Sequence, residues 1–254
     1  MEADITAVTN GGETVALMEP MLIAQGSRHR GDLIDLAVEL AAASAGFRRS
    51  LPDGVRMALG DLVRAMNCYY SNLIEGHDTH PIDIERALNN DYSNDPRKRN
   101  LQLEAKAHIT VQRWIDAGGL KDRSVSMAGI EEIHHRFCTL LPDDLLWIEN
   151  PDTGERLRVV PGQLRDRNVR VGQHIPVTPG AVARFLAHFE NTYSRLGRTE
   201  KIVSAAAAHH RLLWIHPFLD GNGRVARLVS HALSSRLWIR VEYGQSHVAS
   251  AAKS

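Results

Sequence analysis

The chain has 254 residues and 43% of them are hydrophobic, which is enough for one sizeable core. Lysine plus arginine and aspartate plus glutamate both number 30, so no net charge directs the chain to nucleic acid or to a membrane surface. Cys68 and Cys138 have neither metal nor disulfide spacing, and no apolar run is long enough to span a membrane, so a cytoplasmic protein with reduced thiols is expected.

The first 117 residues predict a flexible start followed by helices. Residues 1–30, which contain two adjacent glycines, are expected to form a flexible N-terminal segment. Apolar residues at helical spacing and helix-opening prolines then predict a series of helices. Their expected ranges are 31–46, 52–75, 82–88 and 96–117.

The end of the second predicted helix carries a distinct pattern, Ser71-x-x-x-Glu75-Gly76. Ser71 and Glu75 are one helical turn apart, so their side chains can hydrogen-bond side by side, and Gly76 suits a helix C-cap. A carboxylate at a helix C-terminus is poorly placed electrostatically, so a cation from elsewhere in the chain is expected to hold Glu75. The pattern by itself is also that of an ordinary helix end.

The middle of the chain predicts a β-hairpin among helices. Residues 127–140 predict a helix, in which the adjacent His134 and His135 point about 100° apart, which favours packing over metal binding. Residues 156–160 and 168–172 then read as two short strands of a hairpin or flap. Helices at 179–195 and 199–215 follow, the first with Thr178 as N-cap. A surface hairpin without a role is equally compatible with this stretch.

The most informative segment is His216–Arg227, with the sequence HPFLDGNGRVAR. Gly221-Asn222-Gly223 can turn its backbone N–H groups toward one anion, and residues 224–237 predict a helix directly after it. The turn therefore lies at a helix N-terminus, where free N–H groups and the helix dipole favour phosphate.

The side chains of this segment have complementary chemistry. Arg224 and Arg227 lie on one face of the predicted helix and can hold two phosphates. Asp220 is a hard oxygen ligand suited to Mg²⁺. Pro217 disfavours continuation of the preceding helix, which leaves His216 at a helix end with a pKa near neutrality, suited to a general base. Together they indicate nucleotide chemistry.

This segment resembles the signature of the Fic family at every fixed position. The resemblance implies transfer of AMP from ATP to a Ser, Thr or Tyr hydroxyl of a target protein, with Mg²⁺ as cofactor. It makes His216 the base, Asp220 the Mg²⁺ ligand and Phe218 the apolar anchor of the loop. The ATP-binding residues it implies, besides Phe218, are Gly221, Asn222, Gly223, Arg224 and Arg227. The related Doc branch has lysine in place of Gly223, which favours AMP transfer over phosphate transfer here.

Two further functions follow from the same resemblance. The pattern of Ser71, Glu75 and Gly76 is similar to the inhibitory helix of Fic proteins, in which the glutamate pairs with the second arginine, here Arg227, in place of the γ-phosphate. The hairpin region is similar to a flap that aligns the target segment by strand addition. Its candidate docking residues are Val169, Arg170, Val171 and Gly172.

The sequence therefore predicts an all-α, Fic-type helical bundle with a small β-hairpin flap. Its expected parts are the flexible segment 1–30, a helical region 31–110 with the inhibitory helix, the catalytic core 111–240, and a short tail 241–254 that looks shortened relative to the family. The expected function is protein adenylyl transfer, including self-modification, with ATP, a target protein and a homodimer partner. The alternatives are removal of AMP using Glu75, or a non-catalytic nucleotide-sensing module. No nucleic-acid or membrane partner is expected.

Overall fold

The computed structural model describes residues 9–77, 79–150 and 153–238. Within these residues the chain is mainly helical, and a two-stranded antiparallel sheet joins β1 (Trp147–Glu149) to β2 (Arg156–Arg158). The helices are α1 (Arg30–Ser50), α2 (Asp53–Ile74), α3 (Pro81–Leu88), α4 (Pro96–Asp116), α5 (Met127–Thr139), α6 (Pro179–Tyr193), α7 (Arg198–Ile215) and α8 (Asn222–Trp238). The predicted tail at residues 241–254 lies outside the described residues.

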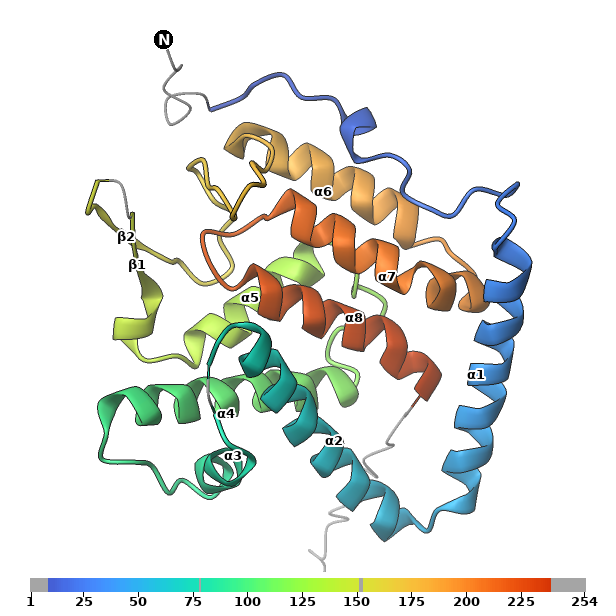
Figure 1. Cartoon of the computed structure of the whole chain (residues 1–254), viewed down its shortest axis with the longest axis horizontal. Helices are drawn as coiled ribbons and strands as arrows, with labels where there is room; N and C mark the ends of the chain where they lie inside the picture. Colours follow the sequence, from blue (N-terminus) through green and yellow to red (C-terminus); the bar gives the residue numbers. More distant parts are fainter. Residues whose placement is uncertain (1–8, 78, 151–152, 239–254) are drawn as a thin grey trace, which may run out of the picture.

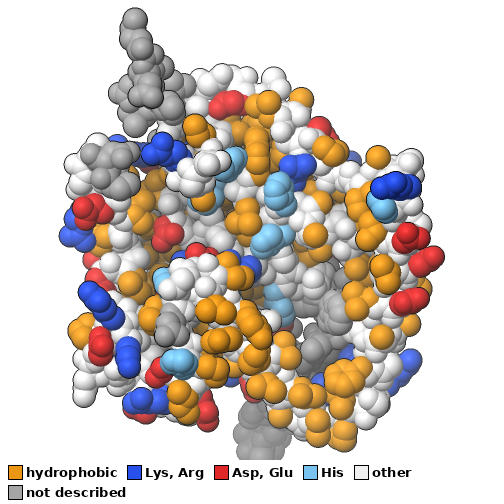
Figure 2. All heavy atoms as spheres, viewed as in Figure 1, with side chains coloured by type: hydrophobic (Ala, Val, Ile, Leu, Met, Phe, Trp, Pro, Cys, Tyr) orange, Lys and Arg blue, Asp and Glu red, His pale blue; other side chains and the backbone are white. Residues whose placement is uncertain are grey.

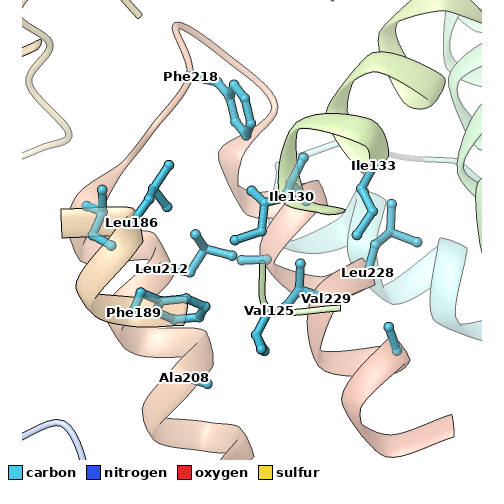
Figure 3. Close-up of a cluster of buried hydrophobic side chains, with 14 of the residues drawn as sticks. Val125, Ile130, Ile133, Leu186, Phe189, Ala208, Leu212, Phe218, Leu228 and Val229 are labelled. Carbon is cyan, nitrogen blue, oxygen red and sulfur yellow. The ribbon is translucent and has the colours of Figure 1, made fainter. Parts of the chain in front are cut away.

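The main core lies where α5, α6, α7 and α8 pack together. Helices α6, α7 and α8 run side by side, with α5 packed against α6 and α8 (Figure 1). Figure 3 shows this cluster, to which α7 contributes Leu212, α8 contributes Leu228 and the loop between the two helices contributes Phe218. Because Phe218 is fully buried in the same cluster, the core directly holds the loop that carries the sequence motif.

A smaller core joins the N-terminal helices. Cys68 of α2, Ile84 of α3, and Ala105 and Ile109 of α4 form a separate buried cluster. Helix α4 also packs against α5 and α8, so it connects this cluster to the main core (Figure 1). Through α4, the end of α2 is placed beside the start of α8.

Helix α1 extends further than predicted. The expected end at Gly46 is wrong, because α1 continues through this glycine to Ser50. A glycine inside a helix costs only about 1 kcal/mol relative to alanine, so a single glycine is not enough to end the helix. Pro52, in an extended conformation before α2, marks the actual break between the two helices.

Residues 9–29, which belong to the segment 1–30 expected to be flexible, form a strap along α6 (Figure 1). Met18 and Met21 of this strap are buried in the main core. Thr178 is the N-cap residue of α6 as predicted, but its hydroxyl donates to Glu13 of the strap at 2.8 Å rather than capping the helix. The Tyr193 hydroxyl of α6 donates to the Met21 carbonyl at 2.6 Å.

The predicted hairpin is only partly correct. The strand expected at 156–160 is present as β2, but it pairs with β1 and not with residues 168–172. The second predicted strand is wrong: Val171 and His174 form an isolated bridge, and Gly172 between them has a φ of 60°. This tight turn ends extended structure after a single pair, so alternating polarity here does not produce a strand.

Apolar side chains are exposed along α1 and α2. Figure 2 shows hydrophobic side chains gathered over the lower part of this face, where α2 meets α1 in Figure 1. The exposed large apolar side chains of the two helices include Leu36 and Phe47 of α1 and Leu62, Leu73 and Ile74 of α2. Contiguous apolar surface of this kind is typical of protein contact sites. Within the described residues, no helix has the length and apolar character needed to cross a membrane.

Candidate active site

The site is built on the loop between α7 and α8, residues 216–221, here called the motif loop. Helix α7 ends at Ile215, and His216 follows as its C-cap in a left-handed conformation with a φ of 51°. Helix α8 starts at Asn222, so the N–H groups of its first turn have no acceptor within the helix. As predicted, the motif loop places His216 at the end of one helix and Gly221-Asn222-Gly223 at the start of the next.

A buried arginine fixes the backbone at His216. Arg165 donates from Nε to the His216 carbonyl at 2.7 Å, and its other nitrogens donate to the carbonyls of Arg167 and Val177. The His174 ring lies 2.8 Å from the Trp214 carbonyl. Both side chains belong to residues 161–177, here called the flap segment, which is therefore tied to the last carbonyls of α7.

The pKa expected for His216 is wrong. Burial lowers the pKa of its imidazole to about 4, and the positive charge of Arg165 acts in the same direction. The ring is therefore neutral at physiological pH, which leaves a nitrogen lone pair free to accept a proton. A pKa of about 4 also makes the imidazole a weaker base than the pKa near neutrality predicted from the sequence would.

Phe218 anchors the motif loop through its ring and its backbone. The ring stacks on His134 of α5 with centroids 3.8 Å apart and planes inclined by 3°. The Asn222 side chain accepts from the Phe218 N–H at 2.9 Å and donates to the Phe218 carbonyl at 2.8 Å. These two hydrogen bonds use both polar ends of the Asn222 side-chain amide, so this side chain braces the loop. The backbone N–H of Asn222 is then the group of this residue that can bind an anion.

The start of α8 has the geometry of an anion-binding turn. Gly221 has a φ of 78°, a conformation that favours glycine and turns the following N–H groups together. Asp220 precedes it with an exposed side chain. The described residues contain no group of three or more His, Cys, Asp or Glu side chains that could hold a metal alone. One carboxylate beside a phosphate site still fits Mg²⁺, which commonly takes one or two carboxylates, with phosphate oxygens and water as its other ligands.

Arg227 is paired with the end of α2. Its Nη2 contacts Glu75 Oε1, and its Nε donates to the Ser71 hydroxyl at 2.8 Å. Gly76, directly after Glu75, has a φ of 78° and turns the chain away. A side chain on Gly223 would collide with the Glu75 carboxylate, so the glycine leaves the space that the Glu75–Arg227 pair occupies.

Arg224 is paired with a buried carboxylate of α4. Its Nε lies 2.5 Å from Glu104 Oε1, and His77 Nδ1 lies 3.3 Å from the other oxygen, Oε2. Burial acts to raise the pKa of Glu104, but His77 and Arg224 outweigh it and hold the pKa below its usual value. The carboxylate is therefore ionised, and both arginines of the motif face acidic side chains from the N-terminal helices.

The comparisons with known proteins agree with this geometry. The sequence model of the Fic/DOC family matches residues 124–234, which run from the start of α5 into α8. These residues form a Fic domain. The described part of the chain brings together every motif residue of that domain, His216 to Arg227, around the start of α8.

Relatives of the Fic domain extend over most of the chain. The protein adenylyltransferase Fic of Drosophila mojavensis is 27% identical over 222 residues, which cover 84% of this chain and 41% of that protein. The protein of the same name from Drosophila melanogaster is 27% identical over 222 residues, 84% of this chain and 42% of its own length. The chain thus spans less than half the length of these relatives.

Solved structures show the same fold at lower identity. A Fic-domain-containing signaling protein from Bacteroides thetaiotaomicron aligns with a TM-score of 0.59 and 19% identity, covering 79% of this chain and 72% of that one. Fic-1 from C. elegans aligns with a TM-score of 0.54 and 20% identity, covering 81% of this chain and 57% of the other. The mostly helical architecture with one small sheet is therefore that of Fic proteins.

Sequence reasoning missed the residues that support the motif of the Fic domain from outside it. His134 was expected only to pack, yet it also accepts from the Gly162 N–H at 2.8 Å and so joins the flap segment to Phe218. Arg165 and Glu104 gave no pattern of their own in the sequence. No local signal marked them: Arg165 stands among polar residues, and Glu104 lies between Gln102 and Lys106 in a helix with many charged residues.

Buried histidines of the Fic domain and α4 predict acid sensitivity. Burial lowers the pKa of His108 to about 3 and those of His134 and His216 to about 4, against 6.5 for the free group. As pH falls below about 6.5 the unfolded chain takes up protons that the folded chain does not, so stability falls by up to about 1.4 kcal/mol per pH unit for each histidine. His77 acts oppositely, because Glu104 raises its pKa, but it is one histidine against four, since burial also lowers the pKa of His209.

Urea unfolding at about pH 7 and about pH 5 measures this dependence directly. The free energy of unfolding is expected to be lower at the acidic pH. His134→Phe keeps a ring against Phe218 and removes one titrating group, so it should reduce the difference. An unfolding free energy that is level over this interval would contradict the burial of neutral histidines.

Proposed function

We propose that the chain is a protein adenylyltransferase that moves AMP from ATP to a hydroxyl of a target protein or of itself. The observation that supports the proposal is the motif loop, in which the neutral imidazole of His216 and the exposed carboxylate of Asp220 directly precede the start of α8 at Asn222. The names of the Drosophila relatives support AMP as the transferred group.

The proposed reaction uses the groups in sequence. The target hydroxyl oxygen attacks the α-phosphorus of ATP, a new P–O bond forms, and the bond from that phosphorus to the oxygen leading to the β-phosphate breaks to release pyrophosphate. His216 takes the hydroxyl proton. The free N–H groups at the start of α8 and the Arg224 guanidinium hold the phosphate oxygens, on which negative charge accumulates. Mg²⁺ would be held by Asp220 and would neutralise charge on the phosphates.

The pair of Glu75 and Arg227 is proposed to inhibit this reaction. Arg227 is the second cationic residue at the start of α8, and the Glu75 carboxylate occupies its outer nitrogen. A γ-phosphate needs the same nitrogen, so nucleotide and Glu75 compete for one partner. The support for this role is the contact itself together with the hydrogen bond from Arg227 to Ser71.

The flap segment is proposed to receive the target polypeptide. Arg170, Val171 and Gly172 are exposed, and Val169 is half-buried beside them. The segment is tied by Arg165 and His174 to the end of α7, next to His216. Pairing through the backbone would place a target hydroxyl near the base with little demand on target sequence. A homodimer and a cytoplasmic location remain proposals from the sequence. The two cysteines, Cys68 and Cys138, are buried free thiols, which is compatible with the proposed location.

Position-specific labelling of ATP tests the proposed reaction. The wild type, Glu75→Gly and the double variant Glu75→Gly with His216→Ala are incubated with Mg²⁺ and ATP labelled at the α- or the γ-phosphate. Label is expected on protein from the α position only, strongest in the single variant and absent from the double. Label from the γ position would establish phosphate transfer. ATP binding without label in any variant would favour removal of AMP or nucleotide sensing.

A further inference from the structure

Glu104 is a buried carboxylate that faces Arg224 of α8 and His77 of the chain just after α2. Its side chain is 6% exposed and that of Arg224 is 11% exposed, so this ion pair is largely shielded from water. An ionised carboxylate in such a place costs several kcal/mol unless it is paired, so its partners are held firmly. His77, the second partner, comes two residues after Glu75 in the sequence.

The contact uses the inner nitrogen of Arg224. Glu104 Oε1 lies against Nε, the guanidinium nitrogen nearest the main chain, and this contact is an ion pair without hydrogen-bond geometry. The Arg224 guanidinium also lies over the Phe137 ring of α5, with 5.7 Å from its central carbon to the ring centroid. The side chain is thus held from two sides, by α4 and by α5, at the start of α8.

The other oxygen of Glu104 reaches the chain just beyond α2. His77 lies there, and its backbone N–H donates to the Asn72 carbonyl at 2.9 Å, which closes the end of the helix. Glu75 and Gly76 lie between these two attachments. One carboxylate therefore connects the arginine of the phosphate site to the segment that keeps Glu75 on Arg227.

We propose that Glu104 is a positioning residue for the nucleotide: it orients Arg224 through Nε and, through His77, holds the end of α2 so that Glu75 stays on Arg227. The proposal rests on the proposed function, because it takes Arg224 and Arg227 to be the phosphate partners. Glu104 itself does not contact the nucleotide. Its two contacts act in opposite directions, since one prepares the site for ATP and the other maintains the inhibited state.

Isosteric replacement of Glu104 separates positioning from a merely structural role. Glu104→Gln is made in the Glu75→Gly background, where inhibition is absent, and Glu85→Gln on the exposed face of α3 is the matched control. The Kd and KM for Mg²⁺–ATP are expected to rise roughly tenfold in Glu104→Gln, the size of a misaligned charged contact. In the control variant Glu85→Gln both constants are expected to stay unchanged. A lower melting temperature and kcat with unchanged Kd and KM would mean a structural role only and would overturn the proposal.

His77→Gln in the chain that retains Glu75 tests the second contact. The variant removes the imidazole that faces Glu104 but keeps a polar side chain, and basal AMP transfer is expected to rise several-fold because the end of α2 is held less firmly. Unchanged basal transfer would overturn the link between Glu104 and inhibition. The Kd for ATP does not depend on transfer, so its rise with Glu104→Gln would still be measurable if the Glu75→Gly parent transferred no AMP, an outcome that counts against the proposed function alone.

Discussion

Replacing Glu75 with glycine is expected to raise AMP transfer by roughly ten- to a hundredfold, since a charged hydrogen bond of about 1.5–3 kcal/mol no longer competes with the nucleotide for Arg227. In the structure the Glu75 carboxylate contacts Arg227 Nη2, and the two side chains are 30% and 20% exposed. The initial rate of label transfer from α-labelled ATP measures the gain. Equal or lower transfer would remove the inhibitory role of Glu75.

Two variants show whether the gain comes from the contact itself. Glu75→Gln keeps the size and removes the charge, so it should give an intermediate rate. Ser71→Ala removes only the neutral hydroxyl that accepts from Arg227 Nε at 2.8 Å, and the smaller gain expected from it would reflect that weaker bond. Helix α2 should tolerate the two changes at Glu75, because a carboxylate at a helix C-terminus opposes the helix dipole and its loss does not weaken the helix.

The motif could be predicted from sequence because it is local. His216, Asp220, Gly221 and Arg227 lie within twelve consecutive residues, and the helix end and helix start that orient them are determined by Pro217 and by the apolar spacing of α8. The pattern at Ser71 and Glu75 also indicated a distant cation, because its electrostatics are unfavourable without one. Resemblance to the family supplied the identity of that cation.

The supporting contacts could not be predicted because they join segments that are distant in sequence. Arg224 and Glu104 are separated by 120 residues, and Arg165 acts on carbonyls about 50 residues away. Nothing in the local pattern distinguishes such a charged residue from a solvated one. The strap at residues 9–29 was missed for a similar reason: Met18 and Met21 lack helical or strand periodicity and become buried only because α6 and α7 already provide a surface.

Removal of the imidazole at His216, in the Glu75→Gly background, is expected to lower AMP transfer by about 10²- to 10⁴-fold, the usual contribution of a positioned general base. The Kd for Mg²⁺–ATP should change little, because the phosphate partners are the start of α8 and its arginines. His210→Ala, at an exposed histidine of α7, is the matched control and should transfer AMP at the rate of its parent. Initial rates from α-labelled ATP and calorimetric binding give the two quantities.

Two substitutions at His216 are needed because its backbone is left-handed. Alanine tolerates a φ of 51° poorly, whereas asparagine adopts this region more readily, so His216→Asn removes the base and keeps the turn into the motif loop. If both variants lose transfer and still bind ATP, the loss belongs to the imidazole and not to a displaced loop. Transfer that survives in both would exclude His216 as the base.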